Sequence, residues 1–144
     1  MPMKNYTTTI DAYQSLGEIQ AALAKHGARR VMIDYGDGGA PQAVTFGIET
    51  PCGPQVFLLP ANVSGVYEAL KRQKARGFSQ EQAFRTAWRN VRDWVLAQMA
   101  FIEAGNADLA EVFLPYLTDG RGHTAYMAYV AGRLQPLLGE GSTP

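Results

Sequence analysis

The sequence predicts an α+β domain in which a small antiparallel sheet with one helix is followed by a layer of three to four helices. Runs rich in β-branched and aromatic residues, separated by glycine- and proline-containing turns, fill much of residues 1–60. From residue 61 onward the apolar residues recur at helical spacing instead. We therefore expect one domain over 1–144, with a sheet-plus-helix part at 1–60, a helical part at 61–138 and a frayed tail at 139–144.

The first part has the predicted order β-α-β-β-β. Residues 4–10 are β-branched and aromatic, which favours a short strand. Asp11 is a good N-cap and Gly27 a good stop for a helix over 12–26. The remaining expected elements are strands at 28–35, 43–49 and 55–59, joined by turns at 36–39 and 50–54.

The second part has a predicted long helix over 80–104. Ser79 and Gln82 have the spacing of a capping box at its start, and Gly105 ends it. Its apolar stripe, which we expect to face the core, is Phe84, Ala87, Trp88, Val91, Val95, Met99 and Ile102. The other predicted helices are 62–76, 107–115 and 124–133, the last with Tyr126, Tyr129 and Val130 facing inward.

A concentration of positive charge is hidden by the neutral total. Seven of the thirteen basic residues lie between Lys71 and Arg92, and Glu81 is the one acid among them. This window carries a net charge of about +6, and the rest of the chain about −6. Such a polarised protein presents its basic side to an anionic partner, of which nucleic acid is the commonest.

The predicted nucleic-acid-binding surface combines the end of one helix with a face of the next. Arg85, Arg89 and Arg92 share one face of the long helix at spacings i, i+4 and i+7. Trp94 lies off the apolar stripe and is the best candidate for an exposed aromatic that stacks a base. The candidate binding residues are Lys71, Arg72, Lys74, Arg76, Arg85, Arg89, Arg92 and Trp94. The alternative is a merely solvated face, with some of the cations favouring a helix dipole.

Catalytic, metal and cofactor sites are not predicted. Residues 36–39 are glycine-rich but lead into a strand without the lysine of a phosphate-binding loop. His26 and His123 are far apart, and Cys52 is the single cysteine. No apolar run reaches membrane-spanning length, so we expect no membrane partner. The single cysteine fits a reducing cytoplasm. Because no catalytic motif is present, we expect no enzyme and no cofactor.

Five segments of the sequence bear on its relationship to other proteins: Tyr6–Thr9, Lys25–Ala28, Leu58–Val63, Ala87–Trp94 and Glu111–Tyr116. In these segments the chain resembles a group of small proteins encoded by tailed bacteriophages and integrated mobile elements. The resemblance spans most of the chain, but its motifs are caps, turns and core aromatics, and it supplies no catalytic residues. It implies a bacterial host cytoplasm.

The leading hypothesis is a non-enzymatic, phage-type accessory protein that binds DNA or RNA through its basic helical surface, with replication or recombination as its setting. The alternative is a protein–protein inhibitor or adaptor that acts on a host defence or replication factor. Acidic side chains elsewhere in the chain could also complement the basic surface of a second copy, so a homo-oligomer is a further expectation.

Overall fold

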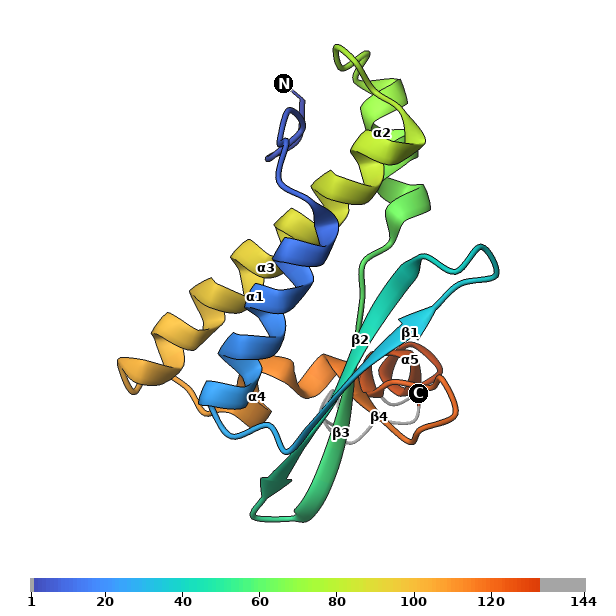
Figure 1. The fold of residues 1–144 in the computed structure, drawn as a ribbon. Coiled ribbons are helices and arrows are strands. Elements are labelled where there is room, and N and C mark those ends of the chain that lie inside the picture. Colours follow the sequence, from blue (N-terminus) through green and yellow to red (C-terminus); the bar gives the residue numbers. More distant parts are fainter. Residues whose placement is uncertain (1, 133–144) are drawn as a thin grey trace, which may run out of the picture.

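The computed structural model describes residues 2–132 and has the predicted α+β architecture (Figure 1). Its elements are, in chain order, α1 (Ala12–Lys25), β1 (Arg30–Tyr35), β2 (Pro41–Thr50), β3 (Gly53–Pro60), α2 (Val63–Arg72), α3 (Gln80–Glu103), α4 (Leu109–Phe113), the 3-10 helix η1 (Leu114–Tyr116), β4 (Leu117–Thr118) and α5 (Ala125–Val130). The helix expected over 107–115 is thus divided into α4 and η1. The expected tail at 139–144, and residue 133 at the end of the last expected helix, lie outside the described residues.

The four strands form one antiparallel sheet in the order β1-β2-β3-β4. Val44 and Phe46 of β2 pair with Leu59 and Phe57 of β3, and these four side chains are buried on the face toward the helices. β4 adds a two-residue strand to β3, with Leu117 opposite Phe57. The expected strand over 4–10 is not part of the sheet, so that prediction was wrong.

The N-terminal segment is held on α3 by side chains instead of by a strand ladder. Thr86 Oγ1 donates to the Asn5 carbonyl at 3.0 Å, and Gln82 Nε2 donates to the Thr8 carbonyl at 3.0 Å. Asn5 has a positive φ of 66°, and its side-chain amide donates to the side chains of Asn90 and Asp93. This left-handed residue and the turn over residues 4–7 interrupt the expected strand near its beginning, so residues 4–10 do not form one extended strand.

The main core lies between the sheet and the helices α1 and α3. Phe46 stacks on Phe57 with ring centroids 5.3 Å apart, and Phe113 of α4 meets Phe46 edge-on at the same distance. Trp88 of α3 is fully buried, and its indole N–H donates to the Pro41 carbonyl at 3.2 Å. The indole therefore contributes both a large apolar surface and a satisfied polar group to the core.

The predicted stripe of α3 is confirmed, because all seven of its side chains are buried or pack against the core. The N-cap prediction is confirmed in part: the Ser79 hydroxyl accepts from the Gln82 N–H at 3.0 Å, but the Gln82 side chain bonds Thr8 and Thr86 instead. No helix within residues 2–132 has an apolar stretch long enough to cross a bilayer.

The last helix forms as α5, but the expectation that its apolar side chains face inward was wrong. Tyr126 and Val130 of α5 are 59% and 64% exposed, and Tyr129 is also largely exposed. The helix has only six residues and packs beside η1 at the β4 side of the sheet. No other described element covers its outer side, so the apolar stripe does not predict its burial.

Candidate nucleic-acid interface

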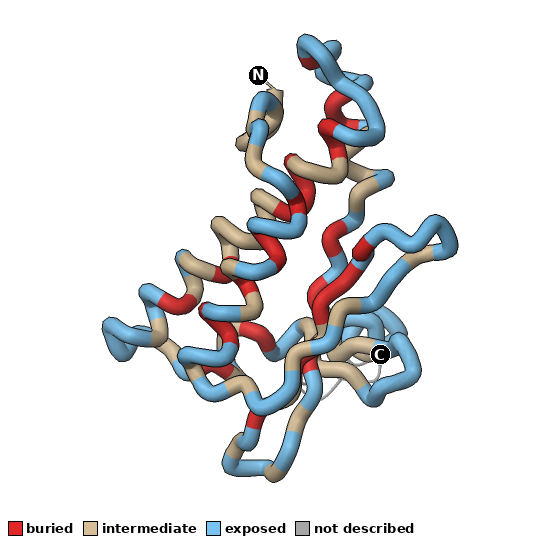
Figure 2. Tube along the Cα trace, in the orientation of Figure 1, coloured by how far each residue is buried: buried red, intermediate tan, exposed pale blue. Residues whose placement is uncertain are grey.

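The segment between α2 and α3 carries four exposed cations, which we call the basic turn: Lys71, Arg72, Lys74 and Arg76. It projects at the end of the molecule farthest from the sheet, and Figures 1 and 2 show it as an almost wholly exposed knob. No carboxylate within residues 2–132 lies within 4 Å of any of the four. Their charge is therefore not neutralised by ion pairs inside the described part of the fold.

The backbone of the basic turn is fixed by a Schellman motif at the end of α2. The Ala75 N–H donates to the Leu70 carbonyl at 3.0 Å, and the Lys74 N–H donates to the Lys71 carbonyl at 3.1 Å. Ala75 and Leu70 are both buried in a small second core. Lys74 has a φ of 54°, the left-handed conformation for which glycine is preferred. The backbone of Lys74 is thus held at a defined place, in a conformation that is strained for a residue with a Cβ.

An aromatic side chain borders the basic turn. Phe78 follows Gly77, is 38% exposed, and its ring lies 5.8 Å from that of Tyr67 on α2. A partly exposed aromatic beside cations can stack an unpaired base. Sequence reasoning missed Phe78, although its position between a glycine and the N-cap Ser79, off every helical stripe, was a usable signal.

Of the three arginines of α3, Arg89 and Arg92 are turned toward α1, and Arg85 reaches the Thr8 carbonyl of the N-terminal segment. The carboxylate of Glu18 on α1 forms ion pairs with Arg92 Nε at 2.8 Å and with Arg89 Nη1 at 3.3 Å. Arg92 also contacts Asp93 at 2.9 Å, and Arg85 contacts Glu81 at 3.3 Å. The expectation that these arginines extend a free basic surface is therefore corrected: all three are paired with acids.

We call Glu18, Arg89, Arg92 and Asp93 the α1–α3 ion network. Partial burial acts to raise the pKa of Glu18, but hydrogen bonds from Arg92 and Arg89 outweigh it and hold that pKa below its usual value. The pKa of Asp93 is also lowered, against a similar effect of burial, by hydrogen bonds from Asn5, Arg92 and Lys4. The carboxylates therefore stay charged, and the network joins α1, α3 and the N-terminal segment.

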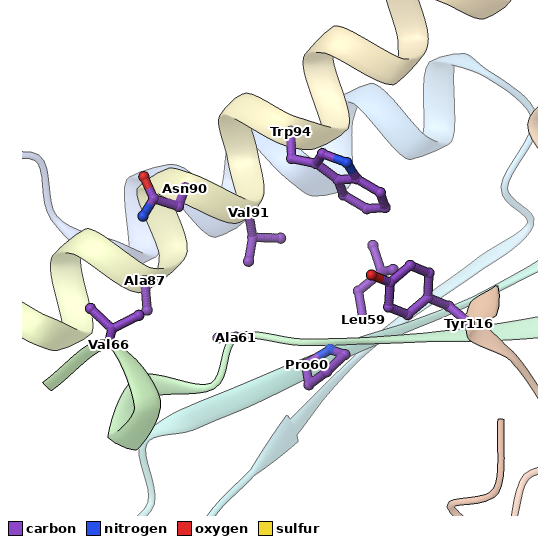
Figure 3. A pocket seen from close by; sticks show the side chains of 9 residues that line it. All are labelled: Leu59, Pro60, Ala61, Val66, Ala87, Asn90, Val91, Trp94 and Tyr116. Carbon is purple, nitrogen blue, oxygen red and sulfur yellow. The ribbon is translucent and has the colours of Figure 1, made fainter. Parts of the chain in front are cut away.

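Trp94 is half-buried, not exposed, which corrects its predicted role in base stacking. Its ring meets Phe113 and Tyr116 edge-on at 5.4 Å and 5.5 Å. Figure 3 shows the indole and the Tyr116 ring at one end of a hollow between α3 and the end of β3.

The hollow has a volume of about 270 Å³. Apart from Asn90 and Tyr116, its lining is apolar in character: Leu59, Pro60, Ala61, Val66, Ala87, Val91 and Trp94. The amide of Asn90 is already engaged, because its oxygen accepts from Asn5. The hollow therefore provides a mainly apolar surface. Its lining contains no cation, so it does not enlarge the positively charged surface of the basic turn.

Across residues 2–132, no three histidine, cysteine, aspartate or glutamate side chains gather in the way that metal ligands do. Compared with family models, curated proteins and solved structures, the chain matches none of them.

Proposed function

We propose that the chain is a non-enzymatic accessory protein that binds nucleic acid through the basic turn. The observation that carries the proposal is the set of four exposed cations without a carboxylate partner in residues 2–132. A setting in phage replication or recombination is part of the proposal and rests on the resemblance of the sequence segments.

The basic turn has the chemistry of a phosphate-binding surface. Arginine offers forked donors that match phosphate oxygens, and lysine adds a mobile point charge. Because Lys71 and Arg72 lie in the last turn of α2, and Lys74 and Arg76 follow it, all four act from one short segment. Contacts to phosphates carry no sequence information, so the binding should be largely independent of base sequence.

The slope of log K against log salt is proportional to the number of phosphates that the protein neutralises, so it measures how many cations take part in binding. If the four cations of the basic turn each neutralise one phosphate, log K should fall against log salt with a slope of about −3.6 on duplex DNA. Raising the salt from about 50 to 200 mM then weakens binding about 150-fold. If the three arginines of α3 also took part, the slope would be about −6.3 and the loss about 6,000-fold.

The test is fluorescence anisotropy with labelled single-stranded and duplex oligonucleotides over that salt range. The double variant Lys71→Gln/Arg76→Gln should make the duplex slope shallower by about 1.8, because two phosphate contacts are lost. The matched control Lys25→Gln/Arg29→Gln removes one exposed lysine and one exposed arginine elsewhere and should leave the slope unchanged. No binding at low salt, or an equal effect of both variants, would contradict the proposal.

The alternative, an inhibitor or adaptor that binds a host protein, is favoured by a different observation. Tyr126, Met127 and Val130 expose more than half of their surface on α5. A protein partner held there should bind with little dependence on salt, since burial of apolar surface is not screened. Its binding should be lost in Tyr126→Ser/Val130→Ser and retained in Lys71→Gln/Arg76→Gln.

A further inference from the structure

The strand β1 is an open edge of the sheet. It comes first in the order β1-β2-β3-β4, so within residues 2–132 it has a strand partner on one side only. The opposite edge is β4, which has two residues, whereas β1 has six. An open edge of this length presents unpaired backbone N–H and C=O groups that can bond to a further strand.

Two hydrogen bonds show which residues of β2 face which neighbour. The Ala61 N–H donates to the Gln42 carbonyl, whereas the Arg29 N–H donates to the Gly47 carbonyl. Even-numbered residues of β2 therefore bond toward β3 and odd-numbered ones toward β1, because these directions alternate in an antiparallel sheet. Through the register Met32 opposite Thr45, the even residues of β1 bond to β2. Val31 and Ile33 thus direct their backbone groups to the open edge.

The side chains of β1 alternate in the same way. Val31 and Ile33 pack against the core, whereas Arg30, Met32 and Asp34 are exposed on the outer face of the sheet. The charged pair is separated by one exposed methionine, which is 54% exposed. Among the described residues, neither Arg30 nor Asp34 forms an ion pair within the fold.

These features are complementary to themselves. When two copies of β1 pair antiparallel about a two-fold axis at Met32, Val31 of each lies opposite Ile33 of the other, and their edge-directed backbone groups meet. The same register places Arg30 of each copy directly opposite Asp34 of the other. Sliding the strands by two residues keeps the core faces aligned but sets Met32 opposite Asp34, or Arg30 opposite Met32, and both charge pairs are lost.

We propose that two copies of this chain associate through β1 in this register and form a continuous eight-stranded antiparallel sheet. The interface is isologous, so each favourable contact occurs twice. Cross-strand pairs of opposite charge stabilise a sheet and like charges opposite each other destabilise it, so Arg30 and Asp34 also select the register. This inference is independent of the basic turn.

Charge reversal tests the register directly. Arg30→Asp alone and Asp34→Arg alone each place like charges opposite each other twice, and each should raise the dimer dissociation constant about tenfold or more. An equimolar mixture of the two variants should form a heterodimer, since Asp at 30 then faces Arg at 34. The double variant Arg30→Asp/Asp34→Arg should dimerise like the original chain. Analytical ultracentrifugation over a concentration series measures all four, with Arg121→Asp as a control for the charge change.

A cysteine at the two-fold axis gives a second readout. Residues opposite each other in a non-hydrogen-bonded pair have Cα atoms about 4.5 Å apart, which lies within the range for a disulfide. In a Cys52→Ser background, Met32→Cys should therefore cross-link into a dimer on mild oxidation. Met127→Cys is the matched control, because that methionine is similarly exposed, at 51%. A chain that stays monomeric up to about 1 mM, or dimers indifferent to the charge reversals, would overturn the proposal.

Discussion

Replacing Lys74 with glycine should stabilise the fold and weaken nucleic-acid binding at the same time. Lys74 occupies the left-handed position that ends α2, with a φ of 54°. A residue with a Cβ pays about 1–2 kcal/mol there, because Cβ crowds the following carbonyl. Glycine escapes that strain but loses about 0.5–1 kcal/mol through the greater freedom of the unfolded chain. The free energy of unfolding should therefore rise by about 0.5–1 kcal/mol.

Lys71→Gly is the matched comparison, because it removes the same charge from the helical part of α2. Glycine inside a helix costs up to about 1 kcal/mol relative to a good helix former, so this variant should be less stable than the original chain. Both variants should lose about one unit of salt slope on duplex DNA, since each removes one cation. Their effects on stability thus have opposite signs while their effects on binding agree.

Urea unfolding followed by far-UV circular dichroism measures the first quantity, and anisotropy titration measures the second. In thermal unfolding, a gain of 1 kcal/mol at the midpoint temperature corresponds to a rise in Tm of about 2–4 °C for a chain of this size. A Lys74→Gly variant that is less stable than the original chain would refute the argument from backbone strain. One that binds as before would refute the role of Lys74 in binding.

Three further predictions concern the core, the ion network and Phe78. Because the pKa of Glu18 is lowered in the fold, its contribution to stability is complete above the ordinary value of 4.5 and is lost as the pH falls through the lowered value. Glu18→Gln should therefore destabilise the fold by about 1–2 kcal/mol near pH 7, and by progressively less as the pH falls below 4.5, measured by urea unfolding over a pH series. Trp88→Phe should cost about 2–3 kcal/mol in a thermal unfolding series, because it leaves a void and an unpaired Pro41 carbonyl. Phe78→Ala should weaken binding to a single strand by about 1–3 kcal/mol and leave duplex binding nearly unchanged, whereas equal losses would exclude base stacking.

Apolar spacing predicted most of the fold, since a stripe repeated over many turns leaves few alternatives. The long helix expected over 80–104 is Gln80–Glu103, and the strands β1, β2 and β3 lie between the predicted turns. The prediction of a strand over 4–10 was wrong because local β propensity contains no information about contacts with residues that are distant in sequence. Thr86 bonds the Asn5 carbonyl across 81 positions. The prediction that the apolar side chains of α5 are buried was wrong, because an apolar stripe does not show whether a second element packs on it.

The candidate site was predicted only in part, because a sequence pattern shows which residues share a face but not which distant residues that face contacts. The concentration of charge located the basic turn, and helical spacing placed Arg89 and Arg92 on one face. What that face meets depends on Glu18, which lies more than 70 positions earlier in the chain. Trp94 was misjudged because Phe113 and Tyr116, which pack on it, come from later elements.

The bond from the Met3 N–H to the Gln73 side chain, at 2.8 Å, places the beginning of the chain beside the basic turn. An affinity tag fused there would therefore lie against the surface whose binding is to be measured, and a histidine tag would change its charge. Titrations should use chain freed of such a tag. The same proximity makes residue 2 a good attachment point for a dye, whose emission would respond when an oligonucleotide occupies the neighbouring cations.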